Sequence, residues 1–83
     1  MPTLRADVPE MARAVGERLR RLRKSRRLTR PAVAAVLKVT PQAVFKYEKG
    51  LSQLPVDLTV KLAKLYGVTC DHILLGEEDR HAA

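Results

Sequence analysis

Apolar residues recur at helical intervals in five segments of the chain, and each segment is bounded by residues that start or stop helices. The first segment has an apolar stripe at intervals of four, four and three residues, formed by Met11, Val15, Leu19 and Leu22. Asp7, with Pro9 and Glu10 after it, is typical of a helix start, so we expect a helix from residue 8 to about residue 26. Gly16 lies inside this helix and is expected to permit close packing of a neighbouring helix.

The second and third segments each begin at a threonine. Thr29 and Thr40 are predicted to cap two short helices, and each is followed by a proline in the first turn, where its missing N–H does no harm. The positions expected to face inward are Val33, Ala34, Leu37, Val44 and Tyr47. Lys38 and Val39 are predicted to form the turn between the two helices, and Gly50 to end the latter as a left-handed cap.

The fourth and fifth segments complete an all-helical pattern. Residues 51–55 are expected to form a loop, and residues 56–66 a helix that ends at Gly67. Its apolar side consists of Leu58, Leu62 and Leu65. Asp71 is expected to cap a short fifth helix that ends at Gly76 and contains Ile73, Leu74 and Leu75. Because strand patterns are absent, the sequence predicts an all-α fold, a compact five-helix bundle.

Length, charge and cysteine content bound the function. The chain has 83 residues, enough for one domain, and its 16 Lys and Arg outnumber 9 Asp and Glu, which gives a net charge of +7. This balance favours a polyanionic partner, either nucleic acid or an anionic membrane surface, although basic surfaces also serve solubility alone. Cys70 is the single cysteine and excludes an internal disulfide, which fits a reducing, cytoplasmic location. No apolar run approaches a membrane span, and no hydrophobic N-terminal segment directs secretion.

Three stretches of the chain are similar to a known family. The run VGERLRRLRKSRRLTR at residues 15–30 resembles the opening of the phage repressor and Cro-like (XRE-type) helix-turn-helix family. LKVTPQAVFKYEKG at residues 37–50 resembles its turn and recognition helix, and KLAKLYGVTCDHILLG at residues 61–76 its last two helices. The resemblance covers roughly residues 11–76 and implies a lambda-repressor-like DNA-binding domain. Together with the helix start after Asp7, it assigns residues 8–76 to this domain, between an N-terminal arm (1–7) that lacks apolar periodicity and is expected to be flexible, and a short polar C-terminal tail (77–83). It also implies a transcriptional regulator, often dimeric, whose third helix enters the major groove of double-stranded DNA.

The resemblance assigns roles to individual residues, and the sequence departs from it in places. Arg23 and Glu48 occupy the positions that pair across the first and third helices in this family. Arg27 and Lys38 stand where the family often has glycine, so a positive φ at either residue would cost about 1 kcal/mol of strain. Pro41 replaces a residue that often reads bases in this family, so we expect no direct readout from that position.

The third helix supplies the candidate base contacts. With Val44 and Tyr47 inward, the residues expected to project outward are Gln42, Phe45, Lys46 and Lys49. Gln42 can bond adenine through two parallel contacts, Lys46 can donate to guanine, and Ala43 is small enough for close apolar approach. Phe45 has two readings: it presses on a thymine methyl in the groove, or it folds back onto the core or a protein interface. The candidate phosphate contacts are Arg27, Arg30 and Lys49.

Other chemistries have little support in the sequence. His72 and His81 lie nine residues apart without a cysteine pair, so we expect no metal site. No catalytic set or phosphate-binding glycine loop is present, so we expect neither an enzyme, nor a cofactor, nor a small-molecule substrate. The sequence favours a sequence-specific regulator, a homodimer acting as a repressor. The alternatives are RNA or nonspecific nucleic-acid binding, or a protein-binding adaptor or antitoxin with an apolar patch formed by Val36, Phe45, Leu51 and Leu54.

Overall fold

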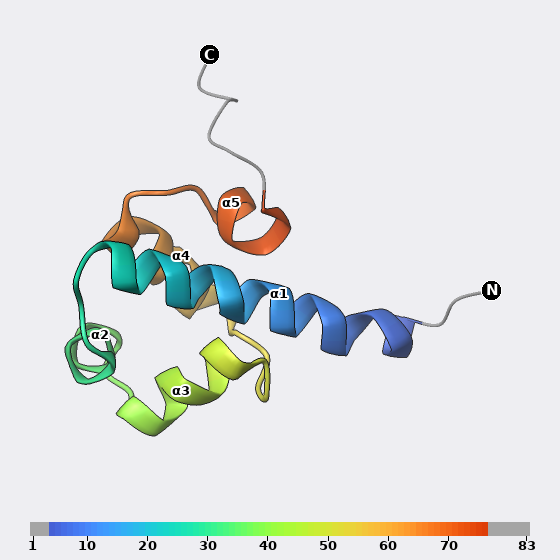
Figure 1. Ribbon diagram of the computed structural model, residues 1–83, viewed down its shortest axis with the longest axis horizontal. Coiled ribbons are helices and arrows are strands. Elements are labelled where there is room, and N and C mark those ends of the chain that lie inside the picture. The colour runs from blue at the N-terminus through green and yellow to red at the C-terminus, as the bar shows by residue number, and fades with distance from the viewer. Residues whose placement is uncertain (1–3, 77–83) are drawn as a thin grey trace, which may run out of the picture.

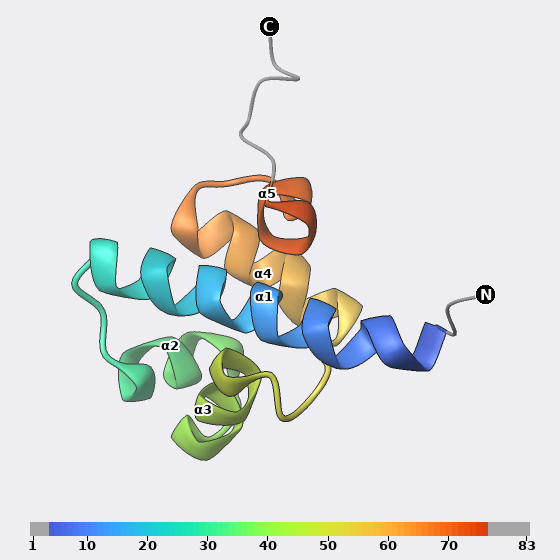
Figure 2. The ribbon, with the colours of Figure 1, turned by 45° about the vertical axis from the view of Figure 1, so that its right-hand side comes forward.

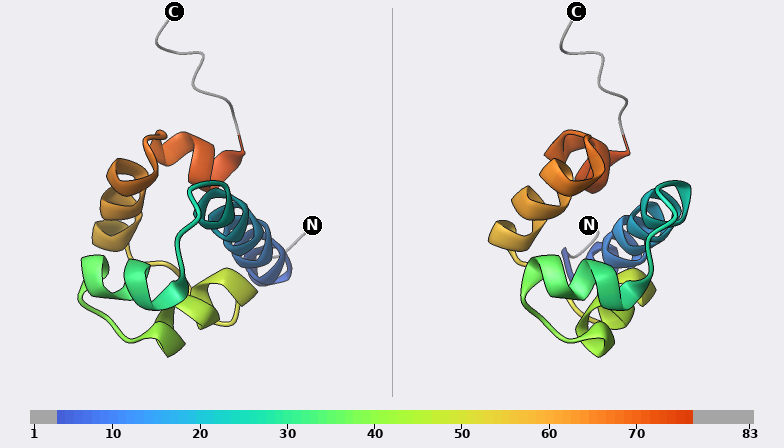
Figure 3. Two further views of the ribbon diagram at one scale, coloured as in Figure 1. Left: turned by 60° about the vertical axis from the view of Figure 1, so that its left-hand side comes forward. Right: turned by 90° about the vertical axis from the view of Figure 1, so that its left-hand side faces the viewer.

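Five helices enclose one core in the computed structural model, which describes the backbone of residues 4–76 and the side chains of residues 9–76 (Figure 1). In this part of the chain the elements are α1 (Leu4–Ser25), α2 (Arg30–Leu37), α3 (Pro41–Lys49), α4 (Val56–Tyr66) and α5 (Cys70–Leu75), with no strand. Helix α1 lies between α3 and α5 and contacts both, and α4 closes the far side of the core (Figures 2 and 3). The predicted all-α, five-helix fold is confirmed.

Helix α1 begins earlier than its capping pattern predicts. It starts at Leu4 instead of residue 8, so residues 4–7 of the predicted arm are helical and Asp7 lies inside the helix. Pro9 is accommodated within α1 because its missing N–H removes only the bond to the carbonyl of residue 5, close to the helix start. The rest of the predicted arm and the whole predicted tail, residues 77–83, lie outside the described residues.

The caps of α2 and α3 are those that the sequence predicts. The hydroxyl oxygen of Thr29 accepts a hydrogen bond from the Ala32 N–H at 3.2 Å, and that of Thr40 accepts one from the Ala43 N–H at 3.1 Å. Each bond satisfies a backbone donor that a helix N-terminus leaves without an intrahelical partner. Gly50 ends α3 with a φ of 73°, in the left-handed region where a residue without a Cβ is unstrained.

Two other helix ends differ in detail from the usual solution. Arg27 after α1 and Lys38 after α2 have φ values of 56° and 60°, so the strain expected at these non-glycine positions is present.

The expected cap of α5 is wrong: Thr69, instead of Asp71, accepts the bond from the His72 N–H at 3.0 Å. Asp71 consequently lies in the first turn of α5, where its negative charge interacts favourably with the positive end of the helix dipole.

The core is formed by the inward faces of all five helices. Its buried apolar residues are Leu19, Leu22, Val33, Ala34, Leu37, Val44, Leu58, Leu62, Ala63, Tyr66 and Ile73. Met11, the first residue of the predicted stripe, is instead 55% exposed. Gly16 is the point of closest approach: a Cβ built there would lie 2.5 Å from the Tyr47 carbonyl oxygen and closer still to that of Glu48. The backbones of α1 and α3 therefore pack directly against each other, as the glycine predicts.

Candidate nucleic-acid interface

Helix α3 presents two distinct faces. Val44 and Glu48 are buried on the side that packs against α1, and Tyr47 is partly buried next to them. The exposed side carries Gln42, Lys46 and Lys49. Ala43 and Phe45 are half-buried, so they lie at the flanks of α3 and not at its most exposed line. The exposed face is thus polar and basic, as the sequence predicts, except at Phe45.

An internal ion pair fixes the position of α3 against α1. Arg23 Nε donates to Glu48 Oε2 at 2.7 Å, and Arg23 Nη2 donates to Glu48 Oε1 at 3.1 Å. Both residues are buried, and Arg23 Nη1 also donates to the Leu28 carbonyl at 3.0 Å. The hydrogen bond to Glu48 raises the pKa of Arg23 against the opposing effect of burial. This bidentate pair, which the family resemblance implies, joins α1, the turn after it and α3.

Arg30 is a second partner of the same carboxylate. As the first residue of α2, it donates from Nε to Glu48 Oε1 at 3.2 Å, and its side chain is one-third exposed. Two guanidinium groups therefore share one carboxylate, which leaves this group of three with one net positive charge. The sequence reasoning named Arg30 but missed its bond to Glu48, because no spacing rule relates residues on different helices.

Phe45 lies against two cations. The Cζ atom of Arg30 lies 5.1 Å from the centre of the Phe45 ring, and the Nζ atom of Lys49 lies 5.7 Å from it. Both distances are within the range of cation–π attraction. The structure thus joins Arg30, Phe45 and Lys49 into one cluster. The spacing of four residues between Phe45 and Lys49 is the one signal in the sequence that indicates part of it.

Neither Arg27 nor the apolar residues of the alternative protein interface other than Phe45 take part in the contacts of this cluster. Arg27 is exposed in the turn between α1 and α2, where its N–H donates to the Lys24 carbonyl at 3.0 Å. Among the apolar residues of the alternative interface, Leu51 is 70% exposed and Val36 is 53% exposed, but Leu54 packs partly against the core.

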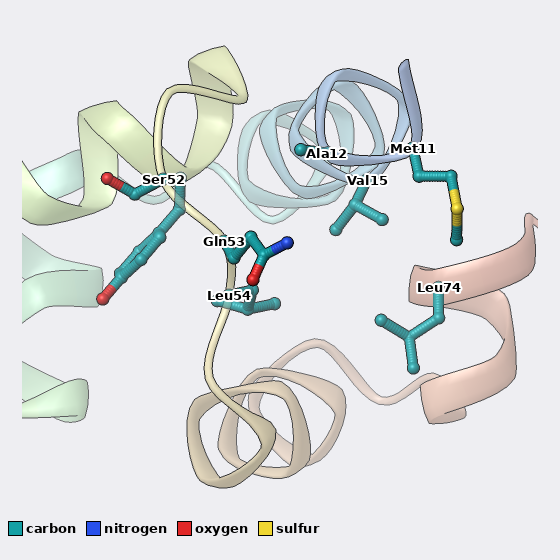
Figure 4. A pocket seen from close by; sticks show the side chains of 8 residues that line it. Met11, Ala12, Val15, Ser52, Gln53, Leu54 and Leu74 are labelled. Atoms are coloured by element: carbon teal, nitrogen blue, oxygen red, sulfur yellow. The ribbon is translucent and has the colours of Figure 1, made fainter. Parts of the chain in front are cut away.

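An apolar cavity of about 200 Å³ opens between α1, α5 and the loop before α4 (Figure 4). Its walls are formed by Met11, Ala12, Val15, Tyr47, Ser52, Gln53, Leu54 and Leu74. None of the exposed side chains of α3 lines this cavity, so it is separate from the basic face.

The described part of the chain offers neither a cluster of metal-binding side chains nor a membrane-spanning helix. Within residues 4–76, no three histidine, cysteine or acidic side chains come together in a way that would hold a metal ion. None of the described helices is both long enough and apolar enough to cross a membrane. His81 and the acidic cluster at residues 77–79 lie outside the described residues.

Comparisons with known proteins add to this geometry. The family described as helix-turn-helix domain matches residues 14–74, most of the chain. The chain is also 38% identical over 58 residues to the uncharacterized HTH-type transcriptional regulator YobD of Bacillus subtilis (strain 168). That match covers 70% of this chain and 52% of YobD, so the chain spans about half the length of the curated relative. No solved structure matches the chain significantly.

Proposed function

The chain belongs to the XRE-like family of helix-turn-helix domains, and from that premise we propose that it is a sequence-specific transcriptional regulator that binds double-stranded DNA. One observation carries the proposal: α3 follows a tight turn after α2 and exposes Gln42, Lys46 and Lys49 on a single face. A net charge of +7 supports a polyanionic partner for that face. The regulator name of a relative is consistent with the same role.

In the proposed complex, α3 lies in the major groove and its N-terminal turn approaches the bases. Gln42 would bond adenine through its side-chain amide, and Lys46 would donate to a guanine edge one turn further along the helix. Ala43 would allow close approach at the flank of α3. Pro41 is exposed but has no side-chain hydrogen-bond donor or acceptor, so it would add only apolar contact.

The sugar–phosphate backbone would be held by Arg27, Arg30 and Lys49. These three side chains carry positive charge at or near the ends of the two helices of the motif. Neutralising phosphates releases counterions from DNA, so the logarithm of the affinity should fall linearly with the logarithm of the salt concentration, by about 0.9 per phosphate contact. This term supplies affinity for every sequence, whereas the base contacts supply the preference.

We further propose a homodimer that acts as a repressor in the cytoplasm by occluding polymerase. Two copies would place α3 in successive major grooves on a two-fold symmetric site, about one helical turn of DNA apart. Light scattering after gel filtration measures the mass of the free protein and of its DNA complex. A complex with two chains on one symmetric duplex supports the dimer, and one chain on an asymmetric duplex contradicts it.

The decisive experiment selects duplexes bound by the protein from a random pool and then titrates variants against the selected duplex and a scrambled one. We expect Arg30→Ala to weaken binding to both duplexes, and Gln42→Ala to lower the preference between them at one base pair, by about 1–3 kcal/mol. Lys61→Ala on the exposed side of α4 is a control that removes the same charge away from α3. Equal losses on both duplexes for Arg30→Ala and Gln42→Ala would contradict the division of roles.

The same titration separates the rival functions. Tight binding without any sequence preference indicates a nonspecific nucleic-acid or RNA-binding protein. A protein that binds no duplex at all instead favours the adaptor or antitoxin function, in which the bundle captures another protein.

A further inference from the structure

We infer that Phe45 is a positioning residue, which acts on the DNA backbone through Arg30 and Lys49 and does not read a base. The inference rests on the proposed function and specifies how its phosphate contacts are prepared. It concerns three residues, Arg30, Phe45 and Lys49, which we call the cation–ring cluster. Of the two readings that the sequence leaves open for Phe45, this cluster supports neither contact with a thymine methyl nor burial in the core.

Two contacts position the guanidinium group of Arg30: a hydrogen bond from Nε to Glu48 and the aromatic ring of Phe45. Its Nε atom bonds Glu48 Oε1 at 3.2 Å, and its Cζ atom lies 5.1 Å from the centre of the Phe45 ring. Its two terminal nitrogens make no hydrogen bond within the described part of the chain. A planar guanidinium presents its donors in a fixed fork, so holding the Nε edge aims the remaining donors outward. That outer edge has the geometry that binds a phosphate through two parallel hydrogen bonds.

Glu48 can hold Arg30 without cancelling its charge. The carboxylate already accepts two hydrogen bonds from the buried Arg23, at 2.7 and 3.1 Å, which compensate its negative charge. Arg30 is therefore the surplus cation of the group and keeps its attraction for phosphate. The same buried pair fixes Glu48 in place, so the anchor of Arg30 is a rigid part of the core and not a flexible surface carboxylate.

Phe45 brings the second cation to the same place. Lys49 follows one helical turn later, and its Nζ atom lies 5.7 Å from the ring centre. Two long basic side chains so close together would otherwise repel each other and spread into solvent. The negative face of an aromatic ring attracts both, so the free protein already holds them near the conformation needed for binding. Phe45 is partly buried in this arrangement, whereas Gln42 and Lys46 are exposed.

The test is a mutant cycle on the selected and scrambled duplexes, measured by fluorescence anisotropy. Removing the ring frees two flexible side chains, so we expect Phe45→Leu to weaken binding to both duplexes about tenfold. Phe45→Tyr, which keeps a ring, should retain wild-type affinity. In an Arg30→Gln/Lys49→Gln background, Phe45→Leu should change the affinity less than about twofold, because the groups through which the ring acts are gone. In a Lys46→Gln background, which removes a cation outside the cluster, the full loss should remain.

A methyl-deletion control tests the rival reading of Phe45 directly. Replacing thymine by uracil in the selected duplex removes the C5 methyl groups and nothing else. If the inference is correct, this replacement changes the affinity of the wild-type protein and of Phe45→Leu by the same factor. The inference would be overturned if the replacement of thymine by uracil weakened binding of the wild-type protein but not of Phe45→Leu. An undiminished effect of Phe45→Leu in the Arg30→Gln/Lys49→Gln background would also overturn it.

Folding and the proposed function are controlled separately. Circular dichroism and thermal melting of each variant establish that it folds, and Phe45→Gln, which also lacks a ring, repeats the cycle if Phe45→Leu does not fold. In the free protein, the ring should shift the NMR signals of the Arg30 side-chain protons upfield, and that shift should vanish in the ringless variant. A wild-type protein that binds no duplex refutes the proposed function, whereas wild-type binding that Phe45→Leu leaves unchanged refutes only the present inference.

Discussion

Replacing Gly16 by alanine tests whether the contact between the backbones of α1 and α3 limits the stability of the fold. An added Cβ would lie 2.5 Å from the Tyr47 carbonyl oxygen, whereas ordinary contacts begin at 3.4 Å. The atoms that it meets belong to the backbone of α3, so no side chain can rotate away. The helix must instead move by about 1 Å, and overpacking of this kind typically costs about 1–3 kcal/mol.

Two further effects modify that cost. Alanine is a better helix former than glycine by about 1 kcal/mol, which offsets part of the loss. Moving α3 also displaces Glu48 from Arg23, whose bond of 2.7 Å depends on the spacing of α1 and α3. We therefore expect Gly16→Ala to lower the free energy of unfolding by about 2 kcal/mol, which corresponds to a melting temperature roughly 10 °C lower in a domain of this size.

Urea and thermal unfolding followed by circular dichroism measure the effect. Gly67→Ala is the matched control, because a Cβ at Gly67 meets no atom within 4 Å and only the φ of 70° opposes it; its cost should be about 1 kcal/mol. Gly16→Val should be less stable than Gly16→Ala, since a larger side chain demands a larger displacement. If Gly16→Ala were as stable as the wild-type protein, the close approach of the two helices would not limit stability and the reasoning would be refuted.

Three other predictions concern the ion pair, a tyrosine and a helix end. Glu48→Ala leaves the guanidinium of Arg23 buried without its partner and should cost about 3–5 kcal/mol in urea unfolding, whereas a loss below 1 kcal/mol would show that Arg23 escapes to solvent. Burial first, and then the negative charge of Glu48, raise the pKa of Tyr66 to about 12 from 10.0, because both disfavour the ionised phenol in the folded protein. This group should therefore leave the free energy of unfolding unchanged below pH 10 and lower it by at most about 3 kcal/mol as the pH rises through 12. Unfolding measured across that range checks it, and Tyr66→Phe should flatten the profile. Lys38→Gly relieves a φ of 60° and should raise the melting temperature, with a gain of up to about 1 kcal/mol; a lower melting temperature would contradict the strain.

The sequence predicts the elements of this fold well because their signals are local. Thr29 and Thr40 each lie three residues before the N–H that their side chains bond, so the caps can be read along the chain. The same rule applies to Thr69, but Asp71 offers a competing cap two residues later, and the sequence alone does not decide between the two candidates. The sequence mispredicts the start of α1 for a similar reason, because Pro9 is typical of a first turn but lies further inside the helix.

The candidate site is predicted less completely because its contacts join different helices. Periodicity distinguishes the buried Val44 from the exposed Gln42, which needs only the geometry of one helix. The bond from Arg30 to Glu48 and the contact of Arg30 with Phe45 depend instead on how α2 packs against α3. No interval along the chain encodes that packing, so the residues were identified and their connection was not.

The closed ends of α3 have a consequence for the energetics of association. Thr40 satisfies a backbone donor at the first turn, and the Gly50 N–H bonds the Tyr47 carbonyl at 3.2 Å at the last. A helix that is capped at both termini is already ordered in the free protein, so binding requires no loss of backbone conformational entropy to form it. Calorimetry should accordingly give a heat-capacity change that matches the surface removed from water alone, without the larger value that accompanies coupled folding.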